Sequence, residues 1–176
     1  MKRIFAISAL FIAQSVVAHQ GHDAASGAMA GLLHPLTGLD HLVALASAGV
    51  LFAATSQRTR WLGVAALIAS LAAGAGIALL GVLLPWSEWV IGFSLLVAGI
   101  MLVYSYRSGT VHPALLISGT MIFALFHGYA HGVEISGDAS GFVLGFLVMS
   151  LVIVLVALQA TRIVSQAVAM RRVRLK

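Results

Sequence analysis

Apolar residues fill most of this chain in long stretches, which short polar segments interrupt. Beyond the N-terminal segment, each apolar stretch is close to the roughly 20 residues that an α-helix needs to cross a membrane. We place these stretches at about 31–54, 62–84, 89–106, 113–133 and 141–161. An open sheet cannot satisfy its backbone hydrogen bonds in lipid, so membrane-spanning segments of this kind are helical. The pattern therefore predicts an all-α polytopic membrane bundle with about five transmembrane helices.

The N-terminus has the layout of a cleavable secretory signal peptide. A basic pair precedes an apolar core, and a small-residue cleavage site ends at Ala18. We expect residues 1–18 to be the signal peptide and residues 19–176 to be one transmembrane helical domain, with an uncleaved first helix as the alternative. The mature chain then begins near His19 and His22, an auxiliary site for metal capture or simply a polar tail.

Composition agrees with a membrane protein and excludes several other classes. The 176 residues are 61% hydrophobic and 9% charged, whereas soluble domains have about 25% charged residues. The chain has no cysteine, which excludes disulfides, thiolate metal sites and iron–sulfur clusters. No segment resembles a phosphate-binding loop, so we expect no direct ATP hydrolysis.

The distribution of charge predicts the orientation in the membrane. After the signal segment, Lys and Arg fall within 57–61, at 107–109 and in the tail from 162 onward. The segments on the opposite side of the predicted membrane carry acids but no Lys or Arg. This asymmetry is the pattern of the positive-inside rule. We therefore expect a multi-pass protein of the bacterial cytoplasmic membrane, with a periplasmic mature N-terminus and a cytoplasmic C-terminus. Membrane lipid and a second copy of the chain are the expected macromolecular surroundings, and nucleic acid is not a partner.

Two short strings place polar side chains inside the apolar stretches. They are His34, Asp40 and His41 in the first string and His127, His131 and Glu134 in the second. Ionisable groups at membrane depth are costly and by default mark a functional site. The second string has its polar residues at i, i+4 and i+7, so they share one helix face, where two imidazoles can reach a single metal ion. The histidines of the first string are also seven residues apart, and its Asp is expected either to bind a metal or to orient an imidazole.

The predicted topology places both strings at one depth. The first helix runs inward and the fourth outward, so Asp40 and His127 both lie roughly 10 Å below the outer surface. Pro35 fits the first turn of a helix, which puts the preceding histidine at the helix mouth. Small residues let membrane helices approach closely, and we expect Gly38, Gly128 and Gly132 to draw the two strings together.

The donors of the two strings are nitrogen and oxygen, which suits Ni²⁺, Co²⁺ or Zn²⁺ better than Cu(I). A buried hydrogen-bonded network that only fixes helix packing is one alternative. A b-type haem protein, with His41 and His127 or His131 as axial ligands, is another. A metallohydrolase with Glu134 as base ranks lower, because the His-Glu-x-x-His order is absent.

The two strings resemble the motifs of the HupE/UreJ family of membrane proteins. That family is marked by a His-Pro-x-x-Gly-x-Asp-His motif, matched by His34 to His41, and by a Phe-His-Gly-x-x-His-Gly-x-Glu motif, matched by Phe126 to Glu134. The resemblance implies a nickel or cobalt permease that supplies metal for hydrogenase, urease or cobalamin pathways. We thus expect inward transport of a divalent cation, without enzyme activity and without a prosthetic group. A metal-binding accessory for metalloenzyme maturation that does not transport is the alternative.

Overall fold

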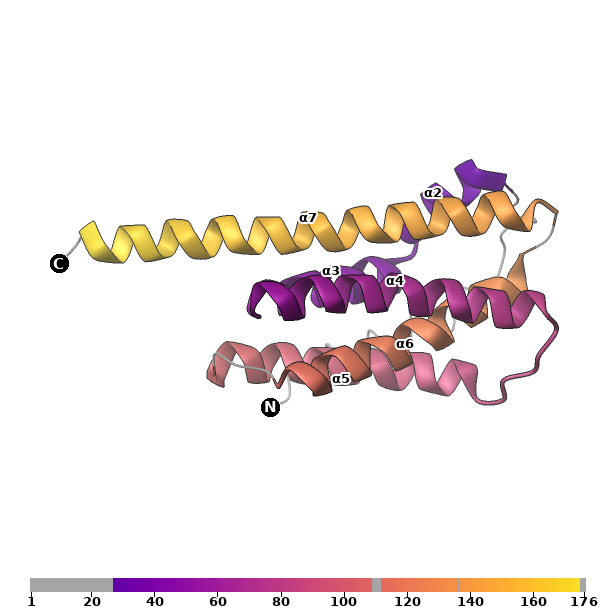
Figure 1. The fold of residues 1–176 in the computed structure, drawn as a ribbon, viewed down its shortest axis with the longest axis horizontal. Helices are drawn as coiled ribbons and strands as arrows, with labels where there is room; N and C mark the ends of the chain where they lie inside the picture. Colours follow the sequence, from indigo (N-terminus) through magenta and orange to yellow (C-terminus); the bar gives the residue numbers. More distant parts are fainter. Residues whose placement is uncertain (1–26, 109–111, 136, 175–176) are drawn as a thin grey trace.

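The computed structural model describes residues 27–108, 112–135 and 137–174. Their regular structure consists of helices α2 (Gly27–Thr37), α3 (Leu39–Ala53), α4 (Gln57–Leu79), α5 (Ser87–Ser108), α6 (Pro113–Glu134) and α7 (Ala139–Arg174), shown in Figure 1. By length and apolar composition four helices can each cross a membrane, and α2 with α3 can form a fifth, broken span. The predicted fold class is confirmed. The expected signal peptide, His19 and His22 lie outside the described residues.

The first predicted span is wrong as a continuous helix, because α2 and α3 are bent by 77° relative to each other. Pro35, expected in a first turn, lies near the end of α2 instead, where its ring removes a backbone N–H from the helix. Gly38 follows in an extended conformation, with φ −86° and ψ 112°, and begins α3. The chain therefore changes direction between His34 and His41.

Glycines allow close contacts between particular helix pairs. A Cβ atom at Gly128 of α6 would lie 2.0 Å from the carbonyl oxygen of Leu71 in α4. A Cβ atom at Gly31 of α2 would lie equally close to the backbone of α7. Gly128 and Gly132 thus bring α6 against α4, and our expectation that they draw the two strings together is wrong. The contact of α2 with α7 instead positions His34, the member of the first string that lies on α2.

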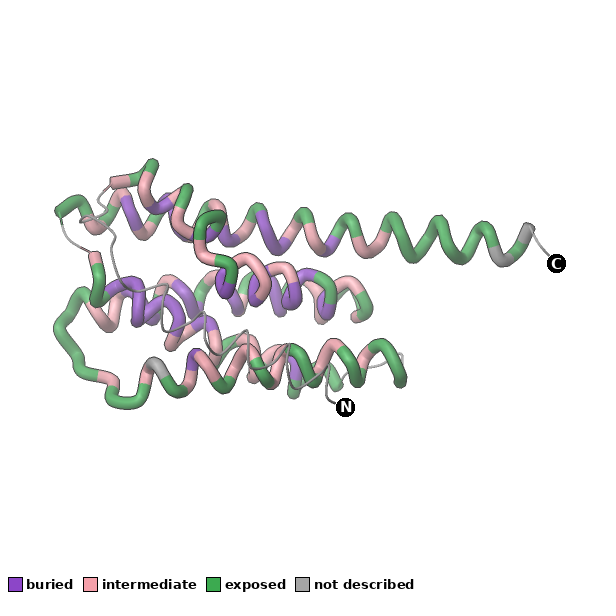
Figure 2. The backbone as a smooth tube through the Cα atoms, turned by 180° about the vertical axis from the view of Figure 1, so that it is seen from behind, coloured by how far each residue is buried: buried purple, intermediate pink, exposed green. Residues whose placement is uncertain are grey.

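The helices differ in how deeply they are packed. In the most apolar part of α5 only 6% of the residues are buried, against 39% in α4, α6 and α7. Gly92 and Gly99 of α5 accordingly face open space. Figure 2 shows the buried positions concentrated between the other helices. α5 therefore lies at the edge of the bundle.

The apolar core lies between α3, α4, α6 and α7. Its fully buried side chains include those of Phe52, Leu67, Leu71, Leu116 and Leu158. α7 continues well beyond the predicted end at residue 161 and projects past the other helices in Figure 1. We call the end of the bundle where α6 ends and α7 begins the α6–α7 end.

Candidate metal site

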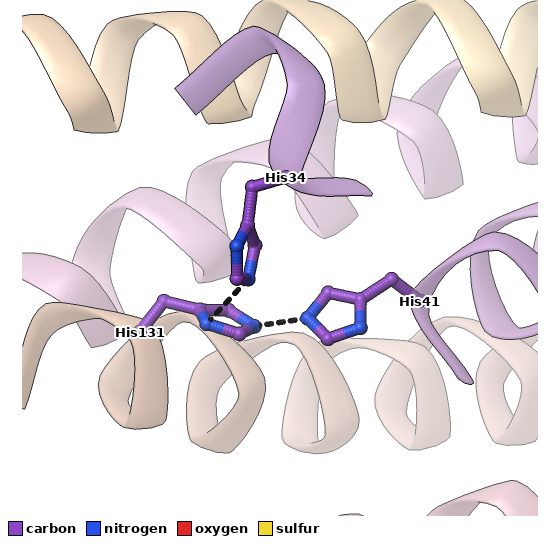
Figure 3. Close-up of side chains that lie close together, drawn as sticks. All are labelled: His34, His41 and His131. Carbon is purple, nitrogen blue, oxygen red and sulfur yellow. Dashed lines mark hydrogen bonds between the residues drawn. The ribbon is translucent and has the colours of Figure 1, made fainter. Parts of the chain in front are cut away.

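Three imidazoles meet between α2, α3 and α6 near the α6–α7 end (Figure 3). Nε2 of His34 is hydrogen-bonded to Nδ1 of His131 at 3.0 Å, and Nε2 of His41 contacts Nε2 of the same ring. One ligand atom from each of the three rings lies within 4.8 Å of the other two. We call His34, His41 and His131 the histidine triad. The fold thus brings side chains of both strings into one group.

The bend between α2 and α3 makes this convergence geometrically feasible. On a straight helix, residues seven apart are separated by about 10 Å along the axis. The ring centroids of His34 and His41 are only 4.9 Å apart. The first ring comes from the end of α2 and the second from the first turn of α3. These residues therefore meet because the helix is broken, and not because they share a face of one helix as we expected.

Asp40 fixes the ring of His41. Its Oδ1 lies 2.8 Å from Nδ1 of His41, and the two residues are 8% and 3% exposed. A carboxylate that holds one imidazole nitrogen commonly orients the other nitrogen toward a metal. Of the two roles expected for Asp40, the geometry favours orientation. A Cβ atom at Gly38 would lie 2.6 Å from Nδ1 of His41, so this pair leaves no space for a side chain at position 38.

His127 lies one turn before His131 on α6, with its ring centroid 4.9 Å from that of His131, and is not a member of the histidine triad. It is 2% exposed, and its ring centroid is 4.4 Å from that of His41. Neither ring nitrogen has a hydrogen-bond partner within the described part of the chain. Leaving a buried polar group unsatisfied costs about 1–3 kcal/mol, so this side chain requires an explanation.

Glu134 lies at the rim of the site. Its side chain is 46% exposed, and its Oε2 is 3.7 Å from Nδ1 of His131. His34 is half-buried, whereas His41 and His131 are each 3% exposed. The site is therefore most accessible on the side of His34 and Glu134.

Comparison with known proteins identifies the family of the chain. The family model described as HupE / UreJ protein matches residues 7–175. The chain belongs to the HupE/UreJ family. Members of the HupE/UreJ family are membrane permeases and not enzymes, and the family is associated with nickel uptake for hydrogenase and urease. This HupE/UreJ chain is thus a multi-pass membrane protein whose helices contact lipid.

A curated relative carries the family name as its own. Protein HupE from Rhizobium leguminosarum bv. viciae is 30% identical over 129 residues, which are 73% of this chain and 65% of that protein. The match therefore spans less than two thirds of the relative's length. No solved structure matches the chain at a significant level.

Sequence reasoning missed the aromatic wall of the site in this HupE/UreJ chain. Phe142 and Phe146 of α7 are 4% and 1% exposed. The ring of Phe142 lies 5.5 Å from that of His34, and the ring of Phe146 lies 5.1 Å from that of His131. Apolar walls exclude water and strengthen electrostatic interactions inside a site. The signal was present in the spacing of four between the two phenylalanines, beside the glycines at 141 and 145, but their partner helix could not be named.

Proposed function

We propose that this chain carries a divalent transition-metal cation, nickel or cobalt, inward across the cytoplasmic membrane. The observation that supports this most directly is the convergence of His34, His41 and His131 from the two family motifs inside an apolar bundle. Imidazole nitrogens suit Ni²⁺, Co²⁺ and Zn²⁺, and the absence of cysteine leaves no thiolate for Cu(I). The metal is the transported substrate and not a resident cofactor.

The environment of the histidine triad supports a route of entry from the α6–α7 end. Glu134 is exposed beside His131, so its negative charge attracts a cation toward the half-buried His34. From there the ion reaches His41, whose ring Asp40 orients. His19 and His22 remain predicted auxiliary residues for capture.

The charge distribution supports the direction of transport. Arg58, Arg60 and Arg107 lie at the opposite end of the bundle, toward which α7 also runs. Under the positive-inside rule, that end faces the cytoplasm and the histidine triad faces the periplasm. The proposed direction of transport is therefore from the triad toward the arginine-bearing end. A second copy of the chain also remains a predicted partner.

Uptake of radiolabelled Ni²⁺ and Co²⁺ tests the proposal. Cells expressing wild type, His41→Ala or His112→Ala at matched membrane levels are compared. His112 is the matched control because it is an exposed histidine at the opposite end. We expect His41→Ala to lose uptake and His112→Ala to retain it. Metal binding by purified wild type without any uptake would replace transport with the accessory function.

A further inference from the structure

Four imidazoles form a compact cluster, in which His34 lies nearest the rim and His127 lies one turn deeper along α6 than His131. The ring centroid of His34 lies 4.4 Å from that of His131, His131 lies 4.4 Å from His41, and His41 lies 4.4 Å from His127. The first ring is half-buried, and the last is 2% exposed. The histidine triad accounts for His34, His131 and His41 and leaves the fourth member of the cluster, His127, unassigned.

A packing role does not account for the fourth ring. His127 lies 4.9 Å from the ring of Phe123, and a phenylalanine or leucine at position 127 would fill the same space. Burying an imidazole with both nitrogens unpaired is costly, and a bound ion is one of the recognised explanations for such a group in a native structure. The nearest ring centroid to His127 is that of His41, itself a member of the triad.

We propose that His127 forms a second, deeper metal position, to which the ion passes from the histidine triad through His41. This inference rests on the proposed function and specifies its next step. His41 lies beside both His131 and His127, so it remains bound while a nitrogen of His127 replaces that of His34. Such an exchange replaces one metal–nitrogen bond with another, and no oxidant, reductant or covalent intermediate is needed.

The surroundings of His127 make this position an occluded one. Asp40 holds the ring of the neighbouring His41 and supplies negative charge near the ion. On the inner side, α6 continues through the buried Ala124 without another ionisable group, and Leu116 is fully buried. The ion in the deeper position therefore has an imidazole path back to the triad and an apolar barrier ahead.

Measurements of Co²⁺ binding and Co²⁺ flux distinguish two metal positions from a single site. The full-length protein is purified as wild type, His127→Phe, His127→Leu and His131→Phe. Co²⁺ binding is followed by equilibrium dialysis and ligand-field absorption, and Co²⁺ flux is measured after reconstitution into lipid vesicles. We expect both His127 variants to bind Co²⁺ nearly as tightly as wild type but to lose flux. We expect His131→Phe to lose both binding and flux.

A packing control is available on the neighbouring turn of α6. Phe123→Leu removes the ring that lies against His127 and keeps the imidazole, so we expect flux to be retained. Circular dichroism and size-exclusion chromatography show which variants are folded, and the leucine variant serves if the phenylalanine variant is not.

Two results would contradict the proposal that His127 forms a deeper metal position. If His127→Phe weakens binding as much as His131→Phe, all four histidines form one site. If the folded His127 variants transport at the wild-type rate, the residue only packs. Wild-type vesicles that bind Co²⁺ without flux would instead overturn the transport proposal, and the relay with it.

Discussion

The two ends of this bundle are built from the same helices but bury different chemistry. At the α6–α7 end, Asp40, His41, His127 and His131 are all nearly inaccessible to solvent. Elsewhere in the described bundle, the buried polar side chains are the serines at 47, 70 and 150, and the remaining core is apolar. Away from the α6–α7 end, the described helices therefore pack without a buried ionisable side chain. The concentration of such side chains at one end is what the proposed function predicts.

Replacing His131, the central histidine of the triad, should have the largest effect on metal uptake. His131 contacts both other members of the histidine triad, so His131→Phe leaves His34 and His41 without a common partner. We expect Ni²⁺ uptake to fall to the background of cells without the protein. His112→Phe removes an imidazole from the opposite end and should leave uptake unchanged. Equal losses in the two variants would show that the difference between the ends has no functional meaning.

Removing the charge behind His41 should have the next largest effect. Asp40→Asn keeps the size of the side chain but weakens its hold on Nδ1 of His41. Substitutions of residues that orient a metal-binding imidazole typically reduce metal affinity by about 10- to 100-fold. Isothermal titration of the purified protein with Ni²⁺ measures this change. Asp138→Asn, at the same end but at the start of α7, is the control that should bind normally.

Alanine substitutions at two glycines of α6 test how closely this helix is packed at the two ends of the bundle. A Cβ atom at Gly128 meets the backbone of Leu71, whereas Gly119 has nothing within 4 Å. Forcing extra atoms into a packed interface costs about 1–3 kcal/mol, so Gly128→Ala should lower the thermal unfolding temperature. Gly119→Ala should leave it unchanged or raise it slightly, because alanine favours a helix by about 1 kcal/mol over glycine. Similar unfolding temperatures for both variants would contradict the close contact of α6 with α4.

The smallest effect concerns the start of α7. Oδ1 of Asp138 accepts hydrogen bonds from the Gly141 backbone N–H and the Ser140 hydroxyl, and these hold the pKa of Asp138 below its ordinary value of 3.8. At a pH above the ordinary pKa, the ionised carboxylate therefore makes its full contribution to the stability of the fold. This contribution is lost as the pH falls through the lower pKa of the folded state. Thermal unfolding of wild type and Asp138→Asn at neutral and strongly acidic pH measures it. We expect the variant to lose less stability on acidification; an identical pH dependence would count against this cap.

Much of the fold could be predicted from the apolar stretches, because a helix that crosses lipid must satisfy its own backbone and needs about 20 residues. The break between α2 and α3 at Gly38 could not be predicted from these stretches. A proline followed three residues later by glycine fits either the beginning of a helix or its end. The choice depends on the docking of α2 against α7 through Gly31, a contact between distant parts of the sequence.

The candidate site was predictable in its residue types but not in its arrangement. Helical spacing correctly places His127 and His131 on neighbouring turns of α6. It does not reveal that Glu134 lies at the rim, or that His34 reaches His131 only across the bend. Those relations depend on how three helices cross, which spacing within one helix does not specify.

The broken first span also constrains how the protein is assembled. α2 has 11 residues and α3 has 15, so neither alone reaches the length of a membrane-spanning helix. α2 packs against α7, the last of the described helices in chain order, through Gly31 and Gly145. α2, the first of these helices to be synthesised, therefore lacks its packing partner until α7 has been synthesised. A chain interrupted before α7 would contain all four histidines of the cluster and still lack the helix against which α2, with His34, packs.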